Sequence, residues 1–110
     1  MNFRNEHDAL GPVKVPAESY AGSFYTRAKS HFQNSSLRAY PSFTSALVWI
    51  KQSAAEVNTQ LGFLDAKLAA AIEQAGAEFI EGRFMEDYDL DVYQAGAGTP
   101  FNMSLNEILA

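Results

Sequence analysis

Two glycines close to the C-terminus constrain this chain more than any other feature. They lie in the run Gln94-Ala95-Gly96-Ala97-Gly98-Thr99-Pro100-Phe101, and two glycines around one alanine allow backbone angles that other residues rarely adopt. Thr99 then stands at the place of a helix N-cap. Pro100 suits the first helical position, where a missing N–H group does no harm. The run therefore predicts a loop that leads into a helix starting at Thr99 or just after it.

A loop that leads into a helix N-terminus has a possible binding function. Its backbone N–H groups and the partial positive charge of the helix favour an anion such as a carboxylate. The simpler interpretation, in which Thr99 only caps its own helix, fits the same residues and stays open. A nucleotide loop is excluded, because Walker A needs Gly-Lys-Ser/Thr and the dinucleotide fingerprint needs a third glycine after a hydrophobic strand.

Length and composition predict one domain, residues 1–110. The chain is 47% hydrophobic, enough for one compact core. Its net charge of −5 and its lack of a Lys/Arg cluster argue against nucleic acid and anionic membranes as partners. No cysteine is present, and His7 and His31 match no ligand spacing, so we expect neither a metal nor a cofactor. Without a signal peptide or a membrane-spanning apolar run, we expect a cytoplasmic protein.

Hydrophobic spacing predicts a small hairpin followed by helices. The hairpin comprises Asn2–Asp8 and Val13–Pro16, with a turn at Leu10-Gly11-Pro12. The predicted helices are Phe24–Gln33 with an apolar face of Phe24, Ala28 and Phe32, a helix from Ser42 as N-cap to Gly62, and Asp65–Glu81 through Leu68, Ile72, Ala75 and Phe79. The second helix has the clearest amphipathic pattern, namely Phe43, Leu47, Ile50, Ala54, Val57 and Leu61.

The C-terminal third is predicted to be an extended connection and a last helix. Residues 83–94 carry the carboxylates Glu86, Asp87, Asp89 and Asp91, which lack the offsets of a calcium loop and are expected to form a solvated face. The helix from Thr99 contains Met103, Leu105, Ile108 and Leu109, enough to bury one side. No stop signal follows, so we expect a chain truncated within its last helix. The predicted fold class is mainly α.

Two cations occupy unusual positions. Arg27 lies near the start of a helix, where a cation is disfavoured unless an anion sits beside it. Lys51 and Asn58 lie at the edge of an apolar stripe. A solvated arginine and a snorkelling lysine explain both positions without a ligand. An anionic pocket nearby is the alternative.

Four blocks of sequence resemble the N-terminal domain of the aspartase/class II fumarase superfamily, over essentially the whole chain. The most specific is Asp91-Val92-Tyr93-Gln94-x-Gly96-Ala97-Gly98-Thr99-x-x-Asn102-Met103-x-x-Asn106-Glu107. The others are Arg4-x-Glu6-x-Asp8-x-x-Gly11 with Val15-Pro16, Tyr20-x-Gly22-x-x-x-Thr26-Arg27-Ala28 with Phe32, and Lys51, Ala54, Ala55 and Asn58 before Leu61-Gly62.

The resemblance implies an elimination that converts a β-substituted dicarboxylic acid to fumarate. A base removes a proton beside one carboxylate, and fixed hydrogen-bond donors stabilise the enediolate that results. The substrate-binding residues that the resemblance implies are Ala97, Gly98, Thr99, Asn102, Arg27 and Lys51. The family's catalytic serine, histidine pocket and long helical bundle would lie beyond residue 110. The chain alone is therefore expected to be inactive.

Small differences favour the aspartase branch, which eliminates ammonia from L-aspartate. Fumarases usually carry serine at the place of Ala97 and tryptophan at the place of Tyr93. Pro100-Phe101 and Ser104 depart from the family pattern. The resemblance implies a homotetramer for the full-length enzyme, and we expect this chain to self-associate. The alternatives are a class II fumarase, which interconverts fumarate and malate, and a non-catalytic helical self-association domain.

Overall fold

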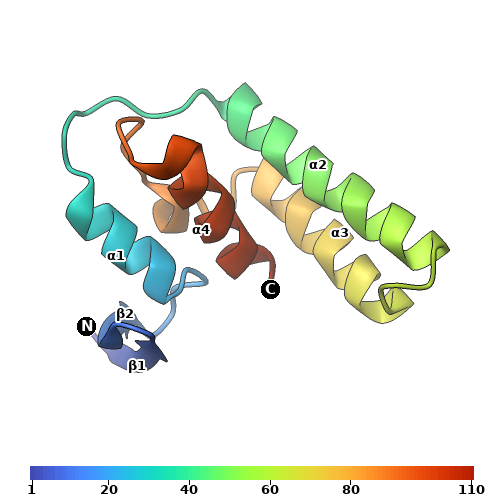
Figure 1. Cartoon of the computed structure of the whole chain (residues 1–110), viewed down its shortest axis with the longest axis horizontal. Helices are drawn as coiled ribbons and strands as arrows, with labels where there is room; N and C mark the ends of the chain where they lie inside the picture. Colours follow the sequence, from blue (N-terminus) through green and yellow to red (C-terminus); the bar gives the residue numbers. More distant parts are fainter.

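A computed structural model describes residues 1–110 and confirms the predicted class, mainly α with a small N-terminal hairpin. Figure 1 shows α2 and α3 side by side as a helical pair, with α4 between this pair and α1. The β-hairpin lies next to the N-terminal end of α1. The elements are β1 Phe3–Asp8, β2 Gly11–Pro16, α1 Ser23–His31, α2 Pro41–Gln60, α3 Ala66–Ile80 and α4 Thr99–Leu109, with 3₁₀ turns η1 Met85–Tyr88 and η2 Gly96–Gly98.

The hairpin forms as predicted, but its turn lies earlier. β1 and β2 pair antiparallel with Asp8 opposite Gly11, so that the turn is Ala9-Leu10 and Pro12 lies inside the strand. Asp8 stabilises the turn by accepting a hydrogen bond from the Leu10 N–H at 2.9 Å. Gly11 has a φ of +107°, which explains why a glycine follows the turn.

Arg4 ties the hairpin to the loop that precedes α1. Its guanidinium donates to the carbonyls of Pro16 at 2.9 Å, Ser19 at 2.6 Å and Ala21 at 2.7 Å. It also donates to the Glu6 carboxylate at 2.9 Å. The five N–H groups of an arginine suit such a cluster of carbonyls. The hairpin is therefore fixed to the rest of the domain by polar contacts.

α1 buries Ala28 of the predicted face and, beside that face, Tyr25. Tyr25 and Ala28 are buried, whereas Phe24 and Phe32 are only partly buried. A tyrosine is tolerated here because its hydroxyl donates to the Glu86 carbonyl at 3.0 Å.

α2 turns a face inward that its hydrophobic pattern did not predict. Its buried residues are Thr44, Val48 and Ala55. The predicted stripe is exposed except for Leu47, and the exposed fractions of Phe43, Ile50, Val57 and Leu61 are 47, 64, 49 and 62%. The N-cap is Tyr40 rather than Ser42, because Pro41 already takes the first helical position. None of the helices has the length and apolar composition to cross a bilayer.

Close helix packing explains which side of α2 is buried. A Cβ atom on Gly76 of α3 would lie 2.9 Å from Val48 Cγ1 and 2.8 Å from Gln52 Nε2. A glycine in α3 allows this approach, so the side of α2 that carries Val48 and Gln52 packs against α3. At the start of α3, Asp65 acts as the predicted N-cap and accepts from the Lys67 N–H at 2.8 Å.

The prediction that the carboxylates of residues 83–94 form a solvated face is wrong. Glu86 is exposed and the Asp89 side chain is 43% exposed, whereas Asp87 is half-buried and Asp91 is buried. Asp87 accepts hydrogen bonds from Ser19 and Tyr20, and Asp89 pairs with Lys29 and Arg38. Asp91 is buried and accepts from the backbone N–H groups of Asn34, Ser35 and Tyr93 and from the Ser35 hydroxyl. These carboxylates bind the segment to α1 and to the connection between α1 and α2.

The core forms where α4 meets α1, α2, α3 and η1. Tyr88 of η1 donates its hydroxyl to the Phe101 carbonyl at 2.7 Å, and burial raises the pKa of Tyr88. The predicted burial of α4 is confirmed for Leu105, Ile108 and Leu109, and Met103 is partly buried. The core residues are Ala21, Tyr25, Ala28, Val48, Phe79, Tyr88, Leu90, Phe101, Leu105, Ile108 and Leu109.

Candidate functional site

The glycine loop adopts the unusual backbone that its sequence predicts. Gly96, Ala97 and Gly98 have φ angles of +70, +53 and +89°. Ala97 is the one residue other than glycine with a positive φ, a conformation that costs roughly 1–2 kcal/mol for an L-residue. A strained residue between two glycines needs support from the surrounding structure.

Thr99 is the first residue of α4 and not its N-cap. The N-cap is Gly98, which makes no side-chain cap. The Thr99 hydroxyl donates backwards to the Gly96 carbonyl at 2.6 Å, and the Thr99 backbone N–H donates to the same oxygen. The predicted capping role is therefore wrong. The exposed hydroxyl stabilises the 3₁₀ turn instead.

The side-chain cap of α4 comes from Gln94, which sequence analysis did not identify as a cap. Its Oε1 accepts a hydrogen bond from the Phe101 backbone N–H at 3.2 Å, and its Nε2 donates to the Asp91 carbonyl at 2.7 Å. Pro100 has no N–H. The N–H groups of Thr99 and Phe101 are thus engaged by the chain itself. The start of α4 offers fewer backbone donors to an anion than a free helix end would.

Lys51 and Asn102, two of the predicted site residues, are in direct contact. The Lys51 Nζ donates to the Asn102 Oδ1 at 2.7 Å. Partial burial lowers the pKa of Lys51. Thr99, Asn102 and Asn106 are spaced by three and four residues along α4, so they share one face of the helix. The arrangement brings a cation, an amide and the end of the glycine loop to one side of the domain.

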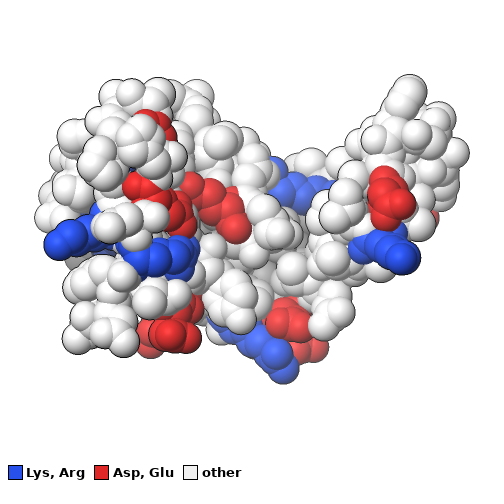
Figure 2. Space-filling model, turned by 90° about the horizontal axis from the view of Figure 1, so that it is seen from below, with Lys and Arg blue, Asp and Glu red and all other residues white.

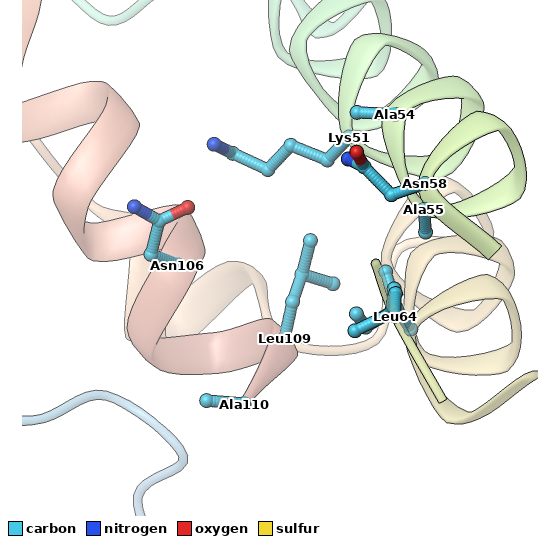
Figure 3. A pocket seen from close by; sticks show the side chains of 9 residues that line it. Lys51, Ala54, Ala55, Asn58, Leu64, Asn106, Leu109 and Ala110 are labelled. Atoms are coloured by element: carbon cyan, nitrogen blue, oxygen red, sulfur yellow. The ribbon is translucent and has the colours of Figure 1, made fainter. Parts of the chain in front are cut away.

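A cavity of about 310 Å³ lies beside the Lys51–Asn102 pair. Figure 3 shows the Lys51 side chain extending from α2 toward α4, with Asn58 on α2 and Asn106 on α4 facing the same space. Apolar side chains form the rest of the wall. The lining residues are Lys51, Ala54, Ala55, Asn58, Leu64, Ile72, Asn106, Leu109 and Ala110. A cationic group over an apolar floor suits a small organic anion.

Arg27 does not join this group of residues. Its guanidinium forms a two-point ion pair with Asp8, at 2.7 Å from Nε and 2.9 Å from Nη2, and also donates to the Gly11 carbonyl at 3.0 Å. Hydrogen bonds from Arg27 hold the pKa of Asp8 below its usual value. An anion therefore does sit beside this arginine, and it belongs to the hairpin.

Two carboxylates occupy the N-terminus of α1, an arrangement that the residue pattern did not reveal. Glu107 of α4 accepts from the N–H groups of Gly22 at 2.9 Å, Phe24 at 2.7 Å and Tyr25 at 3.0 Å. Glu6 accepts from Ser23 at 2.8 Å. A Cβ atom on Gly22 would lie 2.7 Å from the Glu107 Cδ, so a larger residue here would displace this carboxylate. The helix end most suited to an anion is thus filled by the chain's own side chains.

The surface shows how charge is distributed around these sites. In Figure 2 the charged side chains gather on the half that holds the hairpin and α1, and the surface is hollowed between that half and the projecting end of α2 and α3. No three His, Cys, Asp or Glu side chains lie together in a way that could hold a metal ion.

Comparison with known proteins finds relatives of two activities. The chain is 41% identical to aspartate ammonia-lyase of Pseudomonas fluorescens, over 99% of its length and 23% of that enzyme. It is also 41% identical to the class II fumarate hydratase of Nitrosomonas europaea, over 98% of its length and 23% of that enzyme. The chain thus spans about a quarter of the length of these relatives.

A solved structure agrees with the sequence comparison. The fumarate lyase:delta crystallin of Brucella melitensis superposes with a TM-score of 0.93 at 37% identity, over 99% of this chain and 24% of that one. The sequence pattern of the family described as Lyase matches residues 11–110. This chain therefore belongs to the Lyase family, and its fold is that of the N-terminal part of its relatives.

Proposed function

We propose that this chain forms a carboxylate-binding wall in the active site of an enzyme that eliminates ammonia from L-aspartate to give fumarate. The observation that carries the proposal is the 2.7 Å contact between Lys51 and Asn102, on the face of α4 that also carries Thr99. Because the chain spans 23% of its relatives, the activity is proposed for a protein that also contains the remainder.

The reaction explains why donors are needed at this wall. Removal of a proton from the carbon beside one carboxylate leaves its electron pair in an enediolate. The pair then forms the C–C double bond of fumarate as the neighbouring C–N bond breaks and ammonia leaves. Donors that fit the doubly charged enediolate better than the ground-state carboxylate lower the barrier. We assign the proton acceptor to none of these 110 residues, and we expect the chain alone to be inactive.

Each residue of the wall has a proposed role. The Lys51 ammonium supplies positive charge and retains N–H groups besides the one that Asn102 accepts. The Asn102 amide, its oxygen turned to Lys51, presents its N–H groups to the substrate. The N–H groups of Ala97 and Gly98 are proposed to donate to the carboxylate, and the Thr99 hydroxyl to do so after turning away from the Gly96 carbonyl that it bonds in this structure. Arg27 receives no substrate role, since Asp8 already occupies its guanidinium.

Substitution of Lys51 and Thr99 in the longer enzyme tests the proposal. Lys51→Met keeps the length of the side chain and removes its charge. Thr99→Val keeps the shape and removes the hydroxyl. Loss of one preorganised donor to an oxyanion typically lowers kcat about 100- to 1,000-fold, and we expect a smaller change in KM. Fumarate absorbance measures the rate. Lys67→Met is the matched control, because Lys67 is exposed on the surface of α3. Wild-type kcat in both variants would remove these residues from the site.

Two other functions have specific support. A class II fumarase is supported by a relative of that activity at the same 41% identity as the aspartate ammonia-lyase. If the longer enzyme turned over malate and not aspartate, the site would be that of a class II fumarase. A non-catalytic self-association domain is supported by the exposed apolar stripe of α2. A stop codon directly after Ala110 in the coding sequence would favour this domain and contradict the enzyme.

A further inference from the structure

One side chain, that of Gln94, bridges the two ends of the glycine loop. The Gln94 amide bonds the Asp91 carbonyl before the loop, at 2.7 Å, and the Phe101 backbone N–H after it, at 3.2 Å. The loop between these two points contains the three residues with positive φ, 96–98. One amide therefore fixes both ends of a strained segment.

The anchor of this amide is itself rigid. Asp91 is 3% exposed, and its carboxylate accepts from the backbone N–H groups of Asn34, Ser35 and Tyr93. The Asn34 amide also donates to the Tyr93 carbonyl at 2.9 Å. The chain entering the loop is thus held to the connection between α1 and α2.

We infer that Gln94 is a positioning residue that clasps the glycine loop and thereby sets where Thr99 and Asn102 stand. Without the clasp, only the two bonds from Thr99 to the Gly96 carbonyl would hold the strained loop, and the first turn of α4 would fray, because Pro100 contributes no N–H and the Phe101 N–H would lose its acceptor. The link to catalysis rests on the proposed function. The clasp itself does not.

Amide hydrogen exchange on this chain tests the clasp directly. In Gln94→Met, which has the same length and no hydrogen-bonding amide, we expect the protection of the Phe101 amide to fall about fivefold, the effect of one lost hydrogen bond. The amide of Leu105, one turn further into α4, should keep its protection. Unchanged Phe101 protection in a folded Gln94→Met chain would overturn the inference.

Two further variants sharpen this test. Gln33→Met is the matched control. Gln33 also donates an amide N–H to a backbone carbonyl, that of Lys29 at 3.2 Å, and it is exposed just after the C-terminal end of α1. Gln33→Met should leave the protection of the Phe101 amide unchanged. Gln94→Glu keeps the acceptor for Phe101 and loses the donor to Asp91, so Phe101 should stay more protected than in Gln94→Met. It also serves if Gln94→Met fails to fold. If Gln33→Met lowered the protection of the Phe101 amide as much as Gln94→Met does, the inference of a specific clasp would be refuted.

The link to catalysis is tested in the longer enzyme. A misplaced loop moves donors that act on the enediolate, so Gln94→Met should lower kcat about 10- to 100-fold with a smaller change in KM. Loss of Phe101 protection with an unchanged kcat would overturn the positioning role. A wild-type enzyme inactive on aspartate and malate would refute the proposed function alone, because the exchange data would still decide the clasp.

Discussion

Removing the Glu107 carboxylate should destabilise the domain more than any surface substitution. Glu107→Ala leaves the N–H groups of Gly22, Phe24 and Tyr25 without their acceptor and takes an anion from a helix N-terminus. A hydrogen bond to a charged group contributes about 1.5–3 kcal/mol, but three bonds to one carboxylate do not add fully and water reaches this half-buried site. We therefore expect a loss of about 3 kcal/mol. Glu107→Gln, which keeps the shape and loses the charge, should cost about 1–2 kcal/mol.

Urea unfolding followed by circular dichroism measures both losses. Glu56→Ala is the matched control, because Glu56 is exposed on α2 and accepts only from Gln60 at 3.3 Å. Its effect should stay within about 0.5 kcal/mol. If Glu107→Ala and Glu56→Ala gave the same free energy of unfolding, the carboxylate would not be holding α1. The reasoning from its three contacts would then be wrong.

Three more substitutions test separate features. Ser104→Ala should raise Tm by about 4–8 °C, or about 1 kcal/mol, because the buried Ser104 hydroxyl has no hydrogen-bond partner; a lower Tm would contradict this. Bonds from the Tyr93 and Ser35 N–H groups lower the pKa of Asp91, so its stabilisation is present above the unfolded pKa of about 3.9 and is lost as pH falls through the lower folded pKa. Asp91→Asn should therefore be less stable than wild type at pH 7, and acid titration should show that difference shrink at low pH. Ile50→Glu places a charge in the exposed stripe of α2 and should lower the mass measured by light scattering at high concentration; equal masses would count against self-association.

Local patterns predicted the elements well and their buried faces less well. The Asp65 cap, the hairpin and the four helices follow from spacing and from residues near each boundary. The face of α2 does not, because the bulky stripe has the strongest periodicity, whereas Gly76 of α3 selects the side with Val48. Which face a helix buries depends on the shape of its partner, and that shape is absent from the helix's own pattern.

The candidate site divides in the same way. Positive φ angles around Ala97 follow from its flanking glycines, and Lys51 was identified by its place at the edge of a stripe. The caps of α1 and α4 could not be found by local rules, because they come from Glu107 and Gln94 rather than from the adjacent residue. Both residues do belong to the block that carries the family resemblance. That block was the one available signal for them.

The Glu107 contact also bears on how the chain folds as it is made. Phe24 precedes its acceptor by 83 residues. At 5–20 residues per second, a ribosome adds Glu107 roughly 4 to 17 s after Phe24. During that interval only Glu6, which accepts from the Ser23 N–H, can serve the first turn of α1, and a helix of nine residues is marginal in water by itself. Stable formation of the first helix therefore awaits synthesis of the last one, and a nascent chain that stalls before residue 107 presents the N-terminal segment unfolded to chaperones and proteases.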